Sequence, residues 1–66
     1  MARAAREFGL SEREREVAEL YARGRSRAYI SGKLYLSETT VRDHISRVYK
    51  KMGVHNKQDF LNKLEK

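Results

Sequence analysis

The 66-residue sequence predicts an all-α domain of four helices. Between Val41 and Met52, apolar residues recur at the 3.6-residue spacing of an amphipathic helix. Proline is absent, and the β-branched residues never alternate with polar ones over the length of a strand. Residues suited to helix N-caps precede each predicted helix, at Ser11, Ser26, Ser37 and Asn56.

The first predicted helix starts at Ser11, which forms a capping-box pattern with Glu14. Gly24 is the expected stop. The opening turns of this helix contain Glu12, Glu14 and Glu16, and the helix dipole favours negative charge there. We interpret these three glutamates as a solvated face and not as paired catalytic carboxylates.

The second predicted helix spans about 27–34 and is capped by Ser26. Ile30 and Leu34 are one turn apart and anchor it in the core. Gly32 lies inside this helix at a cost of about 1 kcal/mol relative to Ala. A close approach to a neighbouring helix would explain the glycine.

The third predicted helix spans about 38–52, between the cap Ser37 and the terminating Gly53. Its apolar stripe consists of Val41, Ile45, Val48 and Met52. The opposite side carries polar and charged groups, namely Thr39, Arg42, Asp43, Ser46 and Lys50. Such a helix can pack its apolar side on a core and present the other side to a partner.

The fourth predicted helix follows Asn56, with Asp59 completing a variant of the capping box. Phe60, Leu61 and Leu64 form its apolar side. Because so small a domain is not expected to bury all three, we expect Leu64 to face a partner. The whole predicted core comprises Leu10, Val17, Leu20, Tyr21, Ile30, Leu34, Leu36, Val41, Ile45, Val48, Met52, Val54, Phe60 and Leu61.

Composition restricts the function. The net charge of +6 suits a polyanionic partner and is shared evenly by the two halves of the chain. Cysteine is absent, so neither disulfides nor thiolate metal sites form. No segment has the length and hydropathy of a membrane span or a signal peptide, and we expect a cytosolic protein. Residues 1–7 are interpreted as a linker from a preceding domain or as the start of an expressed fragment, and residues 8–66 as the domain itself.

A short turn between the second and third predicted helices gives a helix-turn-helix, with the third helix suited to the DNA major groove. Several separated segments resemble the LuxR-type (GerE-like) DNA-binding domain over about residues 8–64. They are LSEREREV at 10–17, Gly24-x-Ser26, Ile30 with Leu34, Ser37-x-x-Thr40-Val41-Arg42-x-His44-Ile45, and Lys51-Met52-Gly53-Val54.

The resemblance implies the DNA-binding output domain of a bacterial transcriptional regulator, without a cofactor. Its third helix would read the major groove of an inverted-repeat operator. Its fourth helix would form a homodimer on DNA through Leu61 and Leu64. A sensor domain would precede it in a longer protein, and RNA polymerase would be a further partner.

The resemblance, together with the position and charge of each side chain, assigns individual residues. Base-reading positions are Arg42, Asp43, Ser46 and Thr39, since Arg suits guanine and a carboxylate can accept from cytosine. Phosphate-contacting positions are Ser37, Thr40, Arg47, Lys50 and Arg27. Asp43 has an equally good alternative, an ion pair with Arg47 one turn along the helix.

Two segments depart from the family pattern. Arg27-Ala28-Tyr29-Ile30 stands where Asn-Lys-Glu-Ile is common, so both charged groups of that segment are lost. Tyr35 stands where many relatives have Gly. A tyrosine would be strained at positive φ, and we therefore predict negative φ at this turn.

The remaining aromatic and histidine residues favour packing. His44 lies at the edge of the apolar stripe, and with His55 it makes too few ligands for a metal site. The tyrosines could stack on single-stranded bases, but their spacing favours core edges, and Tyr29 is the one that we expect to be exposed. No arrangement of catalytic residues is present, so we do not expect an enzyme. The rival interpretations are the promoter-reading region of a sigma factor and a helical protein-interaction domain.

Overall fold

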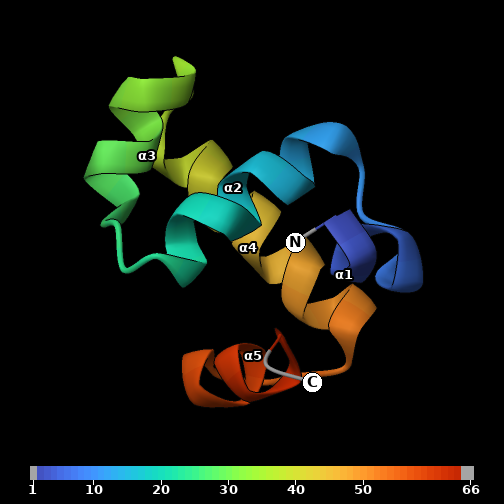
Figure 1. Ribbon diagram of the computed structural model, residues 1–66. Coiled ribbons are helices and arrows are strands. Elements are labelled where there is room, and N and C mark those ends of the chain that lie inside the picture. The colour runs from blue at the N-terminus through green and yellow to red at the C-terminus, as the bar shows by residue number, and fades with distance from the viewer. Residues whose placement is uncertain (1, 65–66) are drawn as a thin grey trace.

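The computed structural model describes residues 2–64, which fold into five helices (Figure 1). The bounds are α1 Ala2–Phe8, α2 Glu12–Ala22, α3 Arg27–Leu34, α4 Glu38–Met52 and α5 Lys57–Leu64. The all-α prediction is confirmed, and α2 to α5 correspond to the four predicted helices. α1 is an additional helix that covers most of the segment interpreted as a linker and extends to Phe8. Position 1 of that predicted linker and positions 65–66 of the predicted domain lie outside the described residues.

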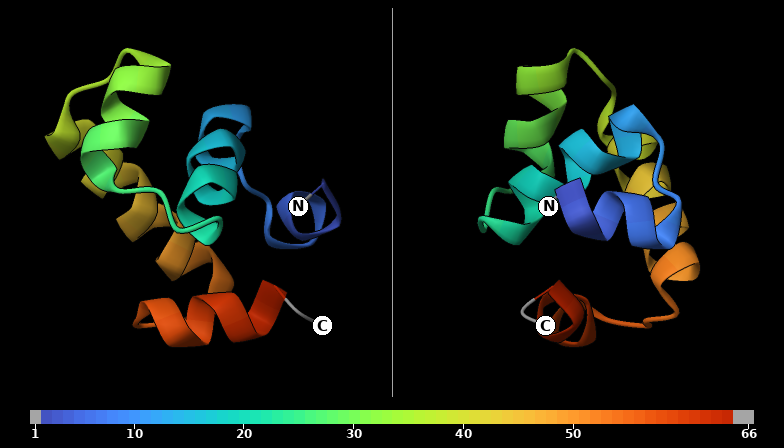
Figure 2. Two further views of the ribbon diagram at one scale, coloured as in Figure 1. Left: turned by 60° about the vertical axis from the view of Figure 1, so that its left-hand side comes forward. Right: turned by 45° about the vertical axis from the view of Figure 1, so that its right-hand side comes forward.

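α4 is the longest helix and the centre of the fold. It packs against α2, α3 and α5 (Figures 1 and 2). All four residues of its predicted apolar stripe are buried, so the amphipathic pattern is confirmed. Gly53 ends the helix at φ +72°, a conformation in which glycine is unstrained. α5 then crosses beneath the end of α4, as Figure 2 shows.

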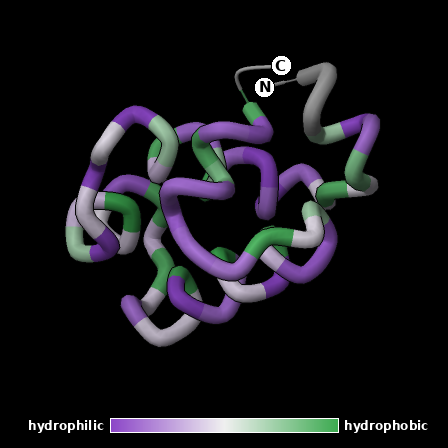
Figure 3. Tube along the Cα trace, turned by 90° about the horizontal axis from the view of Figure 1, so that it is seen from below, coloured by the Kyte–Doolittle hydropathy of each residue, from purple (hydrophilic) through white to green (hydrophobic). Residues whose placement is uncertain are grey.

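The core consists of two clusters that meet around Tyr21 and Tyr49. The first joins the end of α4 to α5 through Val48, Met52, Val54 and Phe60, with Ala18 from α2. The second joins the middle of α2 to α3 and the start of α4 through Val17, Ile30, Val41 and Ile45. Figure 3 shows short hydrophobic stretches interrupted by hydrophilic ones, as expected for helices that bury one face each. The other predicted core residues are partly buried against these clusters.

The capping box of α2 is confirmed in both directions. The Glu14 amide donates to Ser11 Oγ at 3.2 Å, and the Ser11 amide donates to Glu14 Oε1 at 2.9 Å. The helix runs to Ala22, and Gly24 reverses the chain at φ +87°. Local sequence therefore determines both ends of α2.

The interpretation of Glu14 as a solvated residue is wrong. Its side chain is only 4% exposed, because the capping geometry turns it toward α4. Lys51 Nζ lies 2.7 Å from Glu14 Oε1 and 3.2 Å from the Gly9 carbonyl oxygen. This tie connects the start of α2 to the end of α4, a contact that the spacing along the chain does not reveal.

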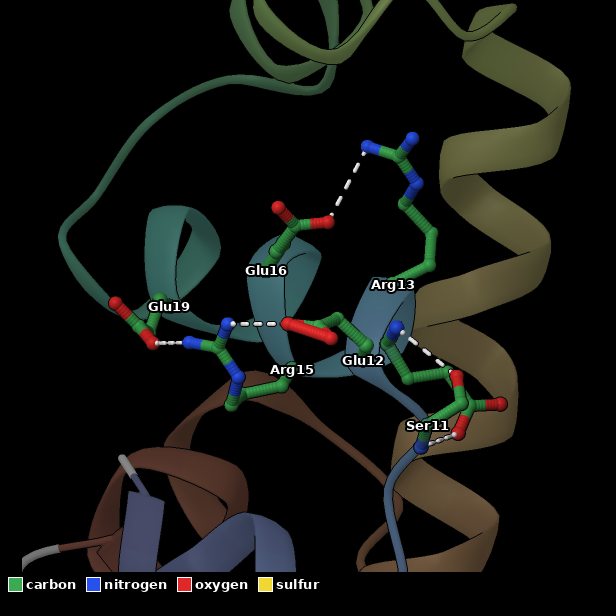
Figure 4. A network of polar contacts seen from close by, with 7 residues as sticks. Ser11, Glu12, Arg13, Arg15, Glu16 and Glu19 are labelled. Carbon is green, nitrogen blue, oxygen red and sulfur yellow. Dashed lines mark hydrogen bonds and ion pairs between the residues drawn. The ribbon is translucent and has the colours of Figure 1, made fainter.

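The rest of the α2 surface carries a charged network (Figure 4). Arg15 lies between Glu19, to which it hydrogen bonds, and Glu12, at 3.4 Å. Arg13 pairs with Glu16 at 3.3 Å. Glu12 is largely exposed, in agreement with a solvated face. Exposed pairs of this kind contribute little to stability, because water and salt screen the charges.

The turn between α3 and α4 contradicts the prediction for Tyr35. Tyr35 has φ +58° and lies in the left-handed region, with its side chain 94% exposed. The backbone has to end α3 and reverse within two residues, and a left-handed residue at the helix end does this. The Leu36 amide donates to the Ser31 carbonyl at 3.0 Å, and Ser31 Oγ donates to the Leu36 carbonyl at 2.6 Å. These bonds hold the strained conformation.

The expected close approach at Gly32 is also wrong. A Cβ atom built at this position would meet no other atom within 4 Å. The glycine therefore lies on the open side of α3, and packing does not explain it.

α5 is capped by Asn56, whose Oδ1 accepts from the Asp59 amide at 2.9 Å. The reciprocal bond differs from a capping box, because the Asp59 carboxylate accepts from Asn56 Nδ2, at 3.3 Å. Phe60 is completely buried, whereas Leu61 and Leu64 are partly buried against the first cluster. The core therefore takes more of this apolar side than predicted.

Candidate nucleic-acid interface

The exposed side of α4 holds most of the predicted DNA-contacting residues. Its exposed residues include Thr39, Arg42, Asp43, Ser46, Arg47 and Lys50. Because the opposite side is anchored in both core clusters, this helix face is held rigidly. Rigid elements position recognition side chains more precisely than loops do.

A concavity of about 220 Å³ joins the start of α3 to the start of α4. Arg27, Glu38, Thr39 and Arg42 line it. Arg27 occupies the first position of α3, after the cap Ser26. The helix-turn-helix arrangement thus brings a basic side chain of α3 to the same concavity as Arg42 of α4.

Two further concavities continue along α4. One of about 240 Å³ is lined by Tyr21, Arg27, Arg42, Ile45, Ser46 and Tyr49. The next, of about 380 Å³, is lined by Ser46, Tyr49, Lys50, Gly53, Val54 and His55. Neighbouring concavities share residues, so they form one continuous surface, which we call the α4 groove. Arg27, Arg42 and Lys50 give it basic side chains, against the single carboxylate of Glu38.

The α4 groove includes five of the nine predicted DNA contacts: Arg27, Thr39, Arg42, Ser46 and Lys50. Asp43 and Arg47 are exposed but do not line it. Among the salt bridges of residues 2–64, none joins Asp43 to Arg47, so the alternative ion pair is not observed.

Ser37 and Thr40 occupy the first turn of α4 and contact each other. Ser37 Oγ accepts from the Thr40 amide at 3.0 Å and lies 2.9 Å from Thr40 Oγ1. The Ser37 side chain is therefore occupied by capping, while the start of α4 keeps free backbone N–H groups that favour anions.

Seven of the twelve residues that line the groove were not predicted as DNA contacts, and four of these have polar side chains: Tyr21, Glu38, Tyr49 and His55. Tyr49 lies one turn from Ile45 and Lys50 follows it, so helical periodicity could have placed Tyr49 between the core and the exposed side. Tyr21 comes from α2, and only the packing of α2 on α4 brings it there.

Tyr21 and Tyr49 form a hydroxyl pair, with Tyr49 Oη donating to Tyr21 Oη at 3.2 Å. Burial, the hydrogen bond and the neighbouring phenol all raise the pKa of Tyr49 above its ordinary value. Tyr49 therefore stays a neutral hydrogen-bond donor at physiological pH.

The prediction that Tyr29 is exposed is confirmed, although Tyr35 is more exposed. Tyr29 is 44% exposed, with the Arg25 guanidinium 4.9 Å from its ring centre, whereas Tyr35 is 94% exposed. His44 is partly buried, and its Nδ1 atom is buried without a partner among the described residues. This placement agrees with a packed histidine.

Membrane-spanning helices and metal sites are two further features that would bear on function. Within residues 2–64, no helix has the length and apolar character needed to cross a membrane. In that same part of the chain, no three side chains of the His, Cys, Asp and Glu types gather into a possible metal site.

Comparison with known proteins identifies the family. The family described as "Bacterial regulatory proteins, luxR family" (GerE) matches residues 9–63. The chain is 47% identical over 45 residues to the spore germination protein GerE of Bacillus subtilis (strain 168), a match that covers 68% of this chain and 61% of that protein. It is 44% identical over 48 residues to the probable transcriptional regulatory protein NarL of Mycobacterium tuberculosis, covering 73% of this chain and 22% of that protein.

The matched segment thus spans less than two thirds of the length of either relative. No solved structure matches the chain significantly. The match extends into α5 as far as residue 63 and includes the whole helix-turn-helix of α3 and α4. The chain therefore belongs to the luxR family of bacterial regulatory proteins and forms its DNA-binding helix-turn-helix domain, which is not a class of enzyme.

Proposed function

We propose that this domain binds duplex DNA sequence-specifically as the output domain of a cytoplasmic transcriptional regulator. The main supporting observation is the α4 groove, in which Arg27 of α3 joins Arg42 and Lys50 of α4. A basic groove along a rigid, amphipathic helix suits the phosphates and base edges of a major groove.

The proposed contacts divide into two classes. Arg42, Ser46, Thr39 and Asp43 read bases, and Arg27, Lys50, Arg47, Ser37 and Thr40 bind phosphates. Arg42 is expected to contribute most to sequence specificity, because its guanidinium can bind guanine O6 and N7 together. Lys50 lies further along α4 and adds affinity without sequence information.

The domain is further proposed to pair on an inverted repeat through α5, with Leu61 and Leu64 at the interface. Both leucines keep part of their surface exposed beside the first core cluster. RNA polymerase is a further proposed partner, as expected of a regulator that acts on transcription.

The test is a selection of random duplex DNA on the purified domain, with sequencing of the bound pool. Enrichment of a short inverted repeat is the expected outcome. An unenriched pool that is nevertheless retained at low salt would reject sequence-specific reading and leave only phosphate binding.

Affinity for the selected duplex then tests the groove. Arg42→Ala is expected to weaken binding by about 1–3 kcal/mol and to relax selectivity at one base position. Arg13→Ala removes the same charge from the α2 surface, outside the groove, and is the matched control. Equal losses of affinity in the two variants would mean that Arg42 contributes only its positive charge, and would exclude it as a base reader.

A further inference from the structure

Tyr21 and Tyr49 form a preorganised group where α2 meets α4. Their hydroxyl oxygens lie 3.2 Å apart, although the residues are 28 positions apart in the chain. Both rings pack against the completely buried Phe60, with ring centres at 5.7 Å and 5.8 Å. The aromatic contacts fix both rings, so the hydroxyl pair has little freedom to rearrange.

One of the two hydroxyl groups in this pair, that of Tyr21, has an O–H donor that is not used within the pair. Each phenol carries one O–H donor, and the single bond between the two hydroxyls uses one of them. Among residues 2–64, the second O–H donates to no other side chain or carbonyl group. A donor held rigidly at the edge of the core is suited to an acceptor that comes from outside the chain.

The surroundings favour an anionic acceptor. Both tyrosines line the 240 Å³ concavity of the α4 groove together with Arg27 and Arg42, and its described lining includes no carboxylate. Lys57 of α5 adds a third cation, with Nζ 4.5 Å from the centre of the Tyr21 ring. Donors therefore come from α2, α3 and α4 to one concavity.

We propose that the Tyr21 hydroxyl, oriented by Tyr49, binds one backbone phosphate of duplex DNA together with Arg27. The proposal rests on the DNA-binding function proposed above and extends its contact surface to α2. A hydrogen bond from a neutral hydroxyl to a charged phosphate oxygen is among the stronger kinds. Contact with α2 fixes the angle of the whole domain on the duplex, since phosphate contacts set register and orientation.

The first test compares Tyr21→Phe with Tyr29→Phe on the selected duplex. Tyr21→Phe removes only the hydroxyl and is expected to weaken binding about 10-fold. Tyr29→Phe removes a hydroxyl outside the groove and is expected to leave the affinity unchanged. The salt dependence of Tyr21→Phe should match that of the wild type, because no charge is lost, whereas Arg27→Ala should lower its slope by about one.

The second test replaces backbone phosphates, one at a time, with neutral methylphosphonates. At the phosphate bound by this concavity, Tyr21→Phe and Arg27→Ala should cause little further loss, and at other positions both should keep their full effect. Tyr49→Phe, which preserves Tyr21 but removes its orienting partner, should give a smaller loss at the same position. Thermal unfolding of each variant shows that the fold is retained.

Unchanged DNA affinity in Tyr21→Phe would overturn the proposal. It would also be overturned if Tyr21→Phe and Arg27→Ala lost their effects at different methylphosphonate positions. Failure of sequence-specific binding gives a different result, because the wild type would then bind all duplexes equally. The loss in Tyr21→Phe can still be measured on such duplexes, so the two failures are distinguishable.

Discussion

Single residues in this domain combine local and long-range roles, and Glu14 is the clearest example. Its carboxylate completes the capping box with Ser11 and also binds Lys51 of α4. Burial by itself raises the pKa of Glu14, but the hydrogen bonds from Lys51 and Ser11 and the charge of Lys51 outweigh it. The net effect lowers the pKa below its ordinary value.

A lowered pKa makes the stability depend on pH. The unfolded chain binds the proton of Glu14 more tightly than the folded chain does, so the stabilisation is present above the unfolded pKa. It is lost as the pH falls through the folded pKa. Glu14→Gln is therefore expected to lower stability by about 1–2 kcal/mol at neutral pH and by less in acid. Urea unfolding of both proteins near pH 7 and pH 3 measures this, and an equal difference at both values would contradict it.

Tyr35 stores strain in the turn of the helix-turn-helix. A left-handed conformation costs an L-residue about 1–2 kcal/mol, and the exposed ring regains little by packing. Tyr35→Gly relieves this strain but also raises the conformational entropy of the unfolded chain, which opposes folding. The net effect is expected to be a gain in stability of about 0.5–1 kcal/mol. Thermal unfolding measures it. A lower melting temperature would show that the ring stabilises the turn through a contact.

At the scale of elements, two glycines with different backbone conformations have opposite predicted effects. Gly32 lies inside α3 and has open space around it, whereas Gly53 ends α4 at φ +72°. Gly32→Ala should therefore stabilise the domain by about 1 kcal/mol. Gly53→Ala should destabilise it by about 1 kcal/mol or more.

The two variants serve as controls for each other, because both add the same methyl group. Denaturant midpoints report the two changes. Destabilisation by Gly32→Ala would mean that the added methyl group meets a neighbouring group on the open side of α3. The turn between α3 and α4 would be the first place to look for that group.

At the scale of the whole molecule, α5 both closes the core and carries the proposed dimer surface. Phe60 is fully buried, while Leu64 is partly exposed at the end of the helix. Lys63 Nζ donates to the Met52 carbonyl oxygen at 2.8 Å, which ties α5 to the end of α4. Pairing through α5 would therefore be transmitted directly to the α4 groove.

Leu64→Glu is expected to abolish cooperative binding to an inverted repeat, because it places a charge in an apolar interface. Its affinity for an isolated half-site should stay near that of the wild type, and this serves as the control for folding. Gel-shift titrations on the two duplexes measure both quantities. Cooperativity that survives the substitution would remove Leu64 from the interface.

Local sequence by itself determined most of the helices of this protein. The capping residues Ser11, Ser26 and Ser37, the stripe from Val41 to Met52 and the terminating Gly53 each act within a few positions, so α2 to α4 could be predicted closely. The exposed side of α4, which the family resemblance assigns to DNA contact, also follows from the helical periodicity.

Tertiary structure decided what depends on contacts between distant residues. The burial of Glu14 against Lys51 and the meeting of Tyr21 with Tyr49 and Arg27 require particular crossings of α2 over α4. The left-handed Tyr35 follows from closing the turn between two packed helices. Periodicity shows which side of a helix is apolar, but packing selects the neighbour on that side and so determines which side chains form the groove.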